Sequence, residues 1–210
     1  MTPACETRLD TGLAALGVEV DATARERLLA LLALLHKWNR AYNLTAVRDP
    51  EQMVTRHLLD SASIAAAVRG PTLLDVGAGA GLPGLVLAIL DPCLAVTMLD
   101  GNGKKVRFQR QAVLELGLDN VTPVQARVET FEHEHGGFDQ IVSRAFAQLA
   151  TFVELTRPLL AEGGEWLAMK GRDAASELAE LPPDVALVER RDLEIPGDEA
   201  QRVLVRLRCS

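Results

Sequence analysis

The sequence predicts an α/β protein with a mostly parallel sheet, and two changes of pattern along the chain support this prediction. After Pro71, short apolar segments alternate with helical segments, which is typical of consecutive βαβ units. Near the C-terminus, two apolar segments are separated by a loop too short for a crossover helix, so we expect them to pair antiparallel. The expected architecture is a seven-stranded, Rossmann-like sheet with an antiparallel C-terminal hairpin over residues 71–210, preceded by a helical cap over residues 1–70.

The composition restricts the class of protein further. The 210 residues include 48% hydrophobic and 24% charged residues, which excludes a disordered chain or a coiled coil. The apolar runs are too short to cross a membrane, and the first residues lack the pattern of a secretory signal. The three cysteines are scattered along the chain, so we expect reduced thiols and a cytoplasmic protein.

The N-terminal region contains two expected helix starts. Asp21 is an expected N-cap because leucines with helical spacing follow it. Asp49 is a second expected N-cap because proline occupies the next position, the first of a helix. We expect this second helix to continue to about Val68.

The remainder of the chain divides into short strands and longer helices. The expected strands are Thr72–Val76, Ala95–Leu99, Thr122–Gln125, Phe138–Ser143, Glu165–Lys170, Val185–Arg190 and Arg202–Arg208. The expected helices between them are Leu82–Leu90, Gly103–Leu116 and Gln148–Leu160.

A glycine-rich turn directly follows the first expected strand. Gly77, Gly79 and Gly81 allow positive φ and let a ligand approach the backbone, while the next helix presents unpaired N–H groups. Asp100, at the end of the second expected strand, is suited to accept hydrogen bonds from the hydroxyls of an adenosine ribose. We therefore expect an adenosine-containing cofactor at this turn.

Two cofactors compete for this pattern. The segment Gly79–Gly84 satisfies the dinucleotide fingerprint G-x-G-x-x-G, which leaves a nucleotide-dependent oxidoreductase as an alternative. In that fingerprint the first glycine should follow the strand directly, whereas here Gly77 does so. An acid inside the strand, Asp75, and the antiparallel terminal hairpin favour S-adenosylmethionine and a class I methyltransferase fold.

Further motifs occur in collinear order from about residue 28 to the C-terminus. They are His36–Thr45, Arg56–Ser61, Asp75–Gly84, Gly103–Phe108, Pro123–Glu129, Ser143–Phe146 and Lys170–Gly171. This set resembles the RsmG (GidB) family of bacterial methyltransferases, which methylate N7 of one guanine in 16S ribosomal RNA. The resemblance implies an S-adenosylmethionine-dependent rRNA (guanine-N7)-methyltransferase.

The resemblance also implies where the cofactor is bound. It places the family's cofactor contacts on Gly77, Leu82, Val128, Glu129 and Arg144.

To these contacts the residue pattern itself adds Gly79 and Asp100. In the family, serine commonly follows the acid, but this chain has Gly101 there and lacks that side chain.

No catalytic residue is assigned. Guanine N7 has an in-plane lone pair and no proton to remove, so its methylation needs alignment with the methyl carbon and sulfur more than a general base. Arg144 is the best candidate for a catalytic contact because it lies just beyond the fourth expected strand. It could bind the cofactor carboxylate, a substrate phosphate or both, and a purely structural ion pair is the alternative.

A basic segment is the candidate for RNA contact. The net charge of −7 argues weakly against attraction to RNA in bulk, but four basic residues and no acidic residue lie between Gly101 and Gln111. A solvated helix face is the alternative interpretation. The expected RNA contacts are Lys104, Arg107, Arg110 and, at the end of the fifth strand, Lys170.

Partners and other chemistries complete the expectations. The resemblance implies 16S rRNA or the small ribosomal subunit as partner, and we expect a monomer without a membrane partner. No metal site is expected, since the pair His133 and His135 lacks further ligands. Cys93 is expected to be a small buried residue and not the nucleophile of a cytosine methyltransferase. A methyltransferase for another RNA and a non-catalytic ribosome-assembly factor remain alternatives.

Overall fold

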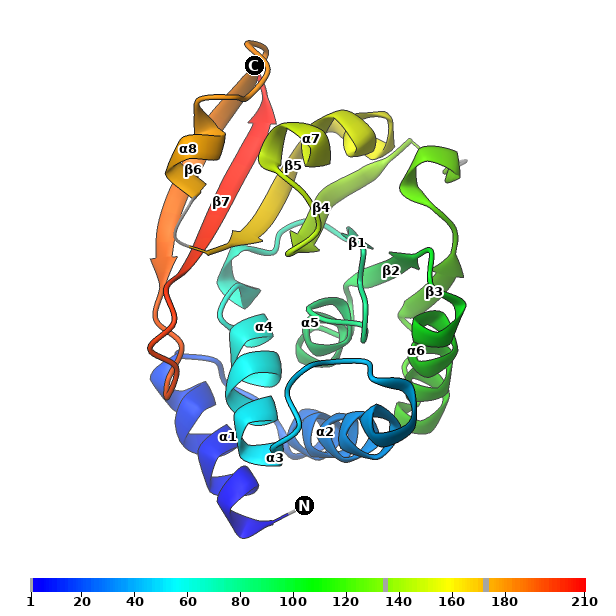
Figure 1. Cartoon of the computed structure of the whole chain (residues 1–210), viewed down its shortest axis with the longest axis vertical. Helices are drawn as coiled ribbons and strands as arrows, with labels where there is room; N and C mark the ends of the chain where they lie inside the picture. Colours follow the sequence, from blue (N-terminus) through cyan, green and yellow to red (C-terminus); the bar gives the residue numbers. More distant parts are fainter. Residues whose placement is uncertain (1, 134–135, 172–173) are drawn as a thin grey trace.

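The computed structural model describes residues 2–133, 136–171 and 174–210. Its centre is a seven-stranded sheet with the order β3-β2-β1-β4-β5-β7-β6, in which β7 runs antiparallel to both of its neighbours. The expected fold class is therefore confirmed (Figure 1). The strands are β1 Thr72–Val76, β2 Ala95–Asp100, β3 Val121–Gln125, β4 Phe138–Arg144, β5 Leu160–Lys170, β6 Val185–Leu193 and β7 Arg202–Cys209.

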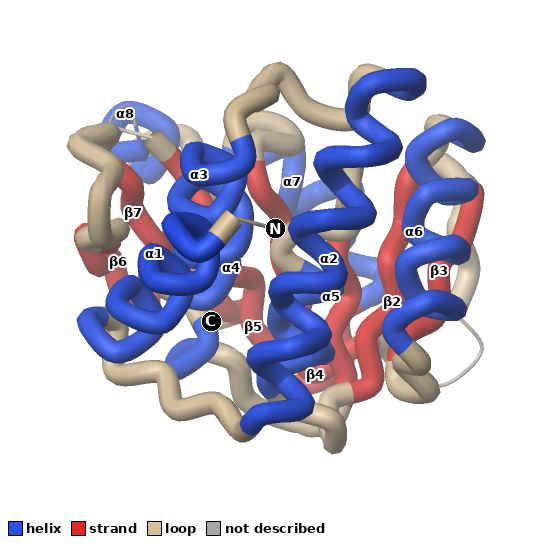
Figure 2. Tube along the Cα trace, turned by 90° about the horizontal axis from the view of Figure 1, so that it is seen from below, coloured by secondary structure: helices blue, strands red, loops and turns tan. Residues whose placement is uncertain are grey.

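Helices cover both faces of the sheet. On one face lie α1 (Pro3–Ala15), α2 (Ala22–Tyr42), α5 (Gly84–Leu90) and α6 (Gly103–Leu116), whose buried side chains form one continuous core cluster. In Figure 2, α2 and α6 lie side by side on this face. A second cluster on the other face contains the buried residues of α7 (Leu149–Thr156). The short helix α8 (Ala174–Leu178) packs against α7.

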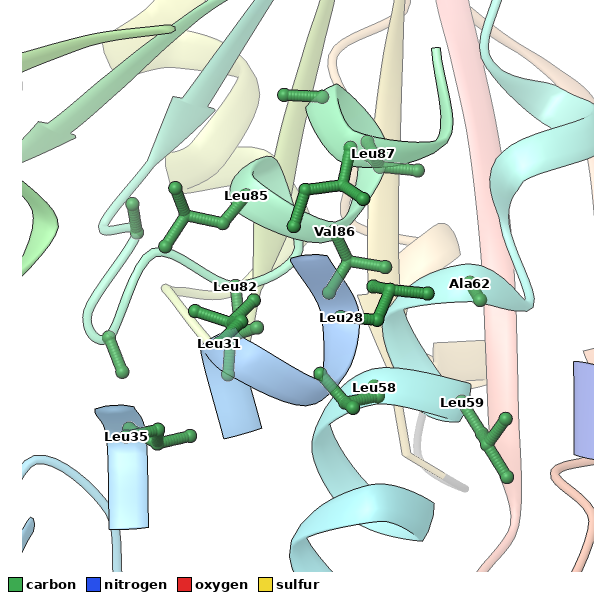
Figure 3. Packing of buried hydrophobic residues seen from close by; sticks show 14 of the residues in the cluster. Leu28, Leu31, Leu35, Leu58, Leu59, Ala62, Leu82, Leu85, Val86 and Leu87 are labelled. Carbon is green, nitrogen blue, oxygen red and sulfur yellow. The ribbon is translucent and has the colours of Figure 1, made fainter. Parts of the chain in front are cut away.

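The N-terminal helices belong to the same packing unit as the sheet. Leu28 and Leu31 of α2 are fully buried in one cluster with Leu58 and with Leu85 of α5, as Figure 3 shows. Removing such leucines from water contributes about 2 kcal/mol each to folding, so α2 holds α5 against the sheet. This packing of α2 on α5 also fixes the position of the glycine turn that precedes α5.

Both expected N-caps are confirmed, but the second helix is not continuous. Asp21 and Asp49 accept hydrogen bonds from the backbone N–H groups of Ala24 and Gln52. Beyond Asp49 the chain forms α3 (Pro50–Met53), a π-helical segment (Val54–Leu59), α4 (Asp60–Ala62) and a 3-10 turn (Ala65–Ala67). The wider π turn accompanies the burial of two polar side chains, His57 and Asp60.

Other expected boundaries also shift for local reasons. The helix expected from Leu82 begins at Gly84, since the glycine turn continues through Pro83. The helix expected to reach Leu160 ends its α-helical part at Thr156 and continues as a 3-10 turn, because Pro158 has no N–H to donate to the carbonyl four residues earlier.

Two surface features complete the fold. Cys93 is exposed in the turn after α5, so the expectation that it is buried was wrong. Its turn begins with Asp91, whose side chain accepts the Cys93 N–H at 2.9 Å and holds this turn at the surface. In the described parts of the chain, every helix is too short or too polar to span a membrane.

Candidate functional site

The glycine turn follows β1, and the backbone of the turn is hydrogen-bonded to β2. Gly77 and Gly79 have φ of 68° and 59°, in the left-handed region that favours glycine. The N–H groups of Gly77 and Ala78 both donate to the carbonyl of Leu99, at 2.8 and 3.1 Å. The buried side chain of Gln109 donates to the carbonyl of Gly79 at 2.9 Å. The turn is therefore a rigid backbone surface with no side chain at Gly77.

Asp75, which the sequence placed inside the strand, fixes the other end of this turn. It is completely buried, and its Oδ2 accepts the N–H of Gly84 at 2.8 Å, at the start of α5. A β-carbon at position 84 would lie 2.8 Å from the same oxygen, so only glycine allows this approach. Burial raises the pKa of Asp75 to about 7.

Asp100 at the end of β2 presents an oriented carboxylate. Its Oδ2 accepts the N–H of Gly79 at 2.9 Å, and its Oδ1 accepts the N–H of Asn102 at 2.8 Å. Lys105 Nζ lies 3.9 Å from Oδ2. Each carboxylate oxygen keeps capacity for a further hydrogen bond, which is what two neighbouring ribose hydroxyls require.

A cavity of about 570 Å³ opens at this edge of the sheet, within the usual range for small-molecule sites. Both polar and hydrophobic side chains line it. The residues that define it include Gly77, Asp100, Lys105, Val128, Glu129 and Phe146. The expected cofactor residues Gly77, Asp100, Val128 and Glu129 therefore come together around one cavity, and Gly79 holds Asp100 from outside it.

The other two expected cofactor residues lie elsewhere. Leu82 is buried in the core cluster beside Leu31 (Figure 3) and does not line the cavity. Arg144 Nη1 forms an ion pair with Asp60 Oδ2 at 2.9 Å and donates to the carbonyl of Arg56 at 3.3 Å. The observed contacts of Arg144 are thus those of a structural ion pair, the alternative interpretation from the sequence.

Asp60 and His57 are further functional candidates. Both lie in the sequence motif Arg56–Ser61, but the sequence did not indicate which residues they contact. Asp60 is buried and lies 3.4 Å from Arg202 Nε as well as pairing with Arg144. His57 Nε2 and Thr45 Oγ1 are 2.8 Å apart. Burial, with a smaller contribution from Arg144, lowers the pKa of His57 to about 4, so this ring is neutral near pH 7.

The expected RNA-binding residues fall into two groups. Lys104, Arg107 and Arg110 are exposed on α6, and none forms an ion pair with another described residue. Lys170 is mostly buried, pairs with Glu177 at 2.7 Å and donates to the carbonyl of Ala147. Its charge is already neutralised by Glu177, so of the four expected residues the three on α6 are the exposed ones. His135 of the H-x-H pair lies outside the described residues.

Phe146 is one of the described cavity residues to which the sequence alone assigned no role. Its motif, Ser143–Phe146, was visible, but the direction of the ring was not. A β-carbon built at Gly77 would lie 2.7 Å from Phe146 Cδ2, so the ring rests on the glycine turn. Only the fold brings these two segments together.

Comparisons with known proteins identify the family of this chain. The model of the GidB family, described as rRNA small subunit methyltransferase G, matches residues 24–205. The chain is 89% identical over 208 residues to "Ribosomal RNA small subunit methyltransferase G" of Chromohalobacter salexigens, covering 99% of each chain. It is 50% identical to the protein of that name in Pseudomonas putida, covering 99% of this chain and 97% of the relative.

Solved structures are similar in fold at low sequence identity. The glycopeptide N-methyltransferase MtfA complexed with S-adenosyl-L-methionine matches with a TM-score of 0.60 and 14% identity over 73% of this chain and 87% of that one. A SAM-dependent methyltransferase from Aquifex aeolicus matches with a TM-score of 0.59 and 16% identity over 78% and 96%. The expected S-adenosylmethionine cofactor and class I methyltransferase fold are confirmed, and the oxidoreductase alternative is excluded. The chain belongs to the GidB family of rRNA small subunit methyltransferases.

Proposed function

We propose that this protein transfers a methyl group from S-adenosylmethionine to N7 of one guanine in 16S ribosomal RNA, as a cytoplasmic monomer. The observation that carries the proposal is the cavity between Gly77 and Asp100, found in a chain whose relatives are named small-subunit rRNA methyltransferases. The position on the base, the compartment and the oligomeric state come from the family resemblance and the composition.

Each part of the cavity has a role in this proposal. When bound, S-adenosylmethionine supplies the methyl carbon as a substituent of a positively charged sulfur. Asp100 accepts hydrogen bonds from the ribose hydroxyls, and the backbone at Gly77 lets the ligand approach closely. Val128 supplies an apolar contact, and Glu129 lies beside it at the cavity wall. Leu82 and Arg144 would act from outside the cavity, as backbone support and as a charged group near its edge.

The reaction requires no proton transfer from the protein. Bond formation from the N7 lone pair to the methyl carbon would be balanced by loss of the carbon–sulfur bond, with the electron pair left on sulfur, so the positive charge would pass to the guanine and no proton would need to move. The site contributes by holding the reactants in line and excluding water, which suffices for a large rate increase. His57 is buried and hydrogen-bonded to Thr45, so it does not act as a general base in the proposed reaction.

The exposed face of α6 is the proposed contact with RNA phosphates. Lys104, Arg107 and Arg110 follow directly after the Asp100 end of the cavity, so they flank the bound cofactor. Basic side chains that neutralise phosphates add affinity without reading sequence. The protein as a whole is acidic and does not attract RNA over long distances. We therefore expect this local basic surface to bind a folded RNA target and not RNA in general.

The direct test is labelled-methyl transfer to 16S rRNA from cells that lack this gene, supplied both naked and in small subunits. Chain cleavage at 7-methylguanine then maps the modified position. Label at a single cleavable guanine supports the proposal, and comparison of the two substrates shows which form the enzyme recognises. Confirmed cofactor binding with label on no guanine would refute it. Light scattering of the same preparation tests the monomer.

A further inference from the structure

Phe146 provides an aromatic surface in the wall of the cofactor cavity. Among the described residues that line this cavity, it is the one with an aromatic ring. It follows β4 by two residues, at the same edge of the sheet as Gly77 and Asp100. The cavity lining thus combines an oriented carboxylate with an aromatic ring.

The ring is held in place by the protein. Its edge packs against the buried Phe152 of α7, with ring centroids 6.3 Å apart and an interplanar angle of 70°. The preceding residue, Ala145, has φ of 54°, a conformation that residues with a β-carbon rarely adopt. Phe146 itself is only partly buried. A strained backbone position next to a partly exposed ring that lines a ligand cavity is characteristic of a binding role.

The chemistry of the proposed reaction requires a surface of this kind. Guanine is flat and stacks well on aromatic side chains, which is how proteins hold unpaired bases. Methylation at N7 gives the base a positive charge, and the face of an aromatic ring attracts a cation. One ring beside Gly77 would therefore both position the base and stabilise the charge that develops on it.

From this placement we infer that Phe146 is the stacking platform for the target guanine. The inference rests on the proposed function and specifies its base-binding site. Lys104, Arg107 and Arg110 contact phosphates and carry no information about the base, so Phe146 is a separate contribution to substrate binding.

The test compares Phe146→Leu with Phe146→Tyr. Leucine retains an apolar contact with Phe152 but has no π face, whereas tyrosine restores the ring. Phe131→Leu is the matched control, because Phe131 is also partly buried in the same core cluster but does not line the cavity. For each variant, the affinity for S-adenosylhomocysteine is measured by calorimetry, and the single-turnover rate of methyl transfer to 16S rRNA is measured with both substrates saturating.

We expect Phe146→Leu to lower the transfer rate about 10- to 100-fold, with S-adenosylhomocysteine affinity within about threefold of wild type. Phe146→Tyr and Phe131→Leu should retain nearly the full rate. Equal losses of cofactor affinity and rate in Phe146→Leu would assign the ring to the cofactor and overturn the inference, as would an unchanged rate. The wild-type reaction distinguishes failure of this inference from failure of the proposed function. If wild type labels no guanine, the proposed function fails as well.

Discussion

The carboxyl edge of the sheet has two halves whose contacts are built differently. On the β1–β2 side, the glycine turn, Asp100 and α6 follow one another closely, and the Gly79–Asp100 hydrogen bond joins residues 21 positions apart. On the β4 side, Arg144 meets Asp60 across 84 positions, and Phe146 meets the turn at Gly77. The first half is a local motif, whereas the second depends on contacts between segments that lie far apart in the sequence.

This difference indicates a division of labour. The β1–β2 side presents backbone groups and one oriented carboxylate, which suits a cofactor whose shape does not change between relatives. The β4 side presents a charged network and an aromatic ring, which suits recognition of a particular base. Changes on the first side should therefore affect cofactor binding, and changes on the second should affect the substrate or the stability of its support.

The largest expected effect is that of Gly77→Ala. The added β-carbon would lie 2.7 Å from Phe146 Cδ2 and displace the ring or the glycine turn, both of which line the cavity, so we expect methyl transfer to fall at least ~100-fold and S-adenosylhomocysteine binding to be lost. Gly17→Ala is the matched control, because Gly17 has the same φ of +68° with nothing within 4 Å. Both variants should lose about 1–2 kcal/mol of stability from backbone strain, and only Gly77→Ala should lose binding. Equal activity in the two variants would contradict this cofactor assignment.

The pH dependence of stability tests the buried acid behind the turn. Burial raises the pKa of Asp75 from its ordinary value of 3.8 to about 7. Between those values the unfolded chain loses this proton while the native state retains it, so the contribution of Asp75 to stability falls as the pH rises from about 4 to 7. Asp75→Asn lacks this effect.

Urea unfolding at a series of pH values checks the sign. The stability of Asp75→Asn relative to wild type should increase across this window by on the order of 3 kcal/mol. His57 also titrates differently in the two states, but it is common to both proteins and cancels in the difference. A difference that is flat, or that decreases with pH, would show that Asp75 is ionised in the native state.

On the β4 side, Asp60→Asn should break the buried ion pair with Arg144. Removing one partner of such a pair is costly, and because the Arg144 side chain is 24% exposed we expect a loss of roughly 2–3 kcal/mol in the free energy of unfolding. Asp184→Asn, which breaks the exposed pair with Arg157, is the control and should lose less than about 1 kcal/mol. Similar losses in the two variants would mean that the Asp60 network does not support this half of the site.

The smallest expected effects are those on RNA affinity. Lys104→Gln and Arg107→Gln should each weaken 16S rRNA binding about two- to fivefold and reduce the salt dependence by about one charge, without changing S-adenosylhomocysteine affinity. Arg208→Gln removes an exposed charge from the strand ends at the opposite edge of the sheet and serves as the control. Filter binding at several salt concentrations measures both quantities. If the control weakens binding as much as the α6 variants, the contact is not localised on α6.

The same division explains what could be predicted from the sequence. The strand Thr72–Val76 with its glycine turn, the Asp100 carboxylate at the end of β2 and the whole of α6 follow from local spacing, and the structure places them as expected. The π-helical segment and the burial of Asp60 could not be derived, because both depend on partners far along the chain. Lys170 was expected at an open rim, but its neutralisation by Glu177 required knowing where α8 packs.

The contact between Asp100 and the cofactor ribose is the interaction on which cofactor binding at this site depends most directly. The decisive measurement is the affinity of wild type and Asp100→Asn for S-adenosylhomocysteine and for its 2′-deoxyribose analogue, by calorimetry. Because the carboxylate accepts a hydrogen bond from the hydroxyl, wild type should bind the analogue at least about tenfold more weakly. The variant should bind the two ligands within about threefold of each other. If loss of the hydroxyl weakens binding equally in both proteins, or not at all in wild type, then Asp100 does not hold the ribose and the cofactor lies differently in this cavity.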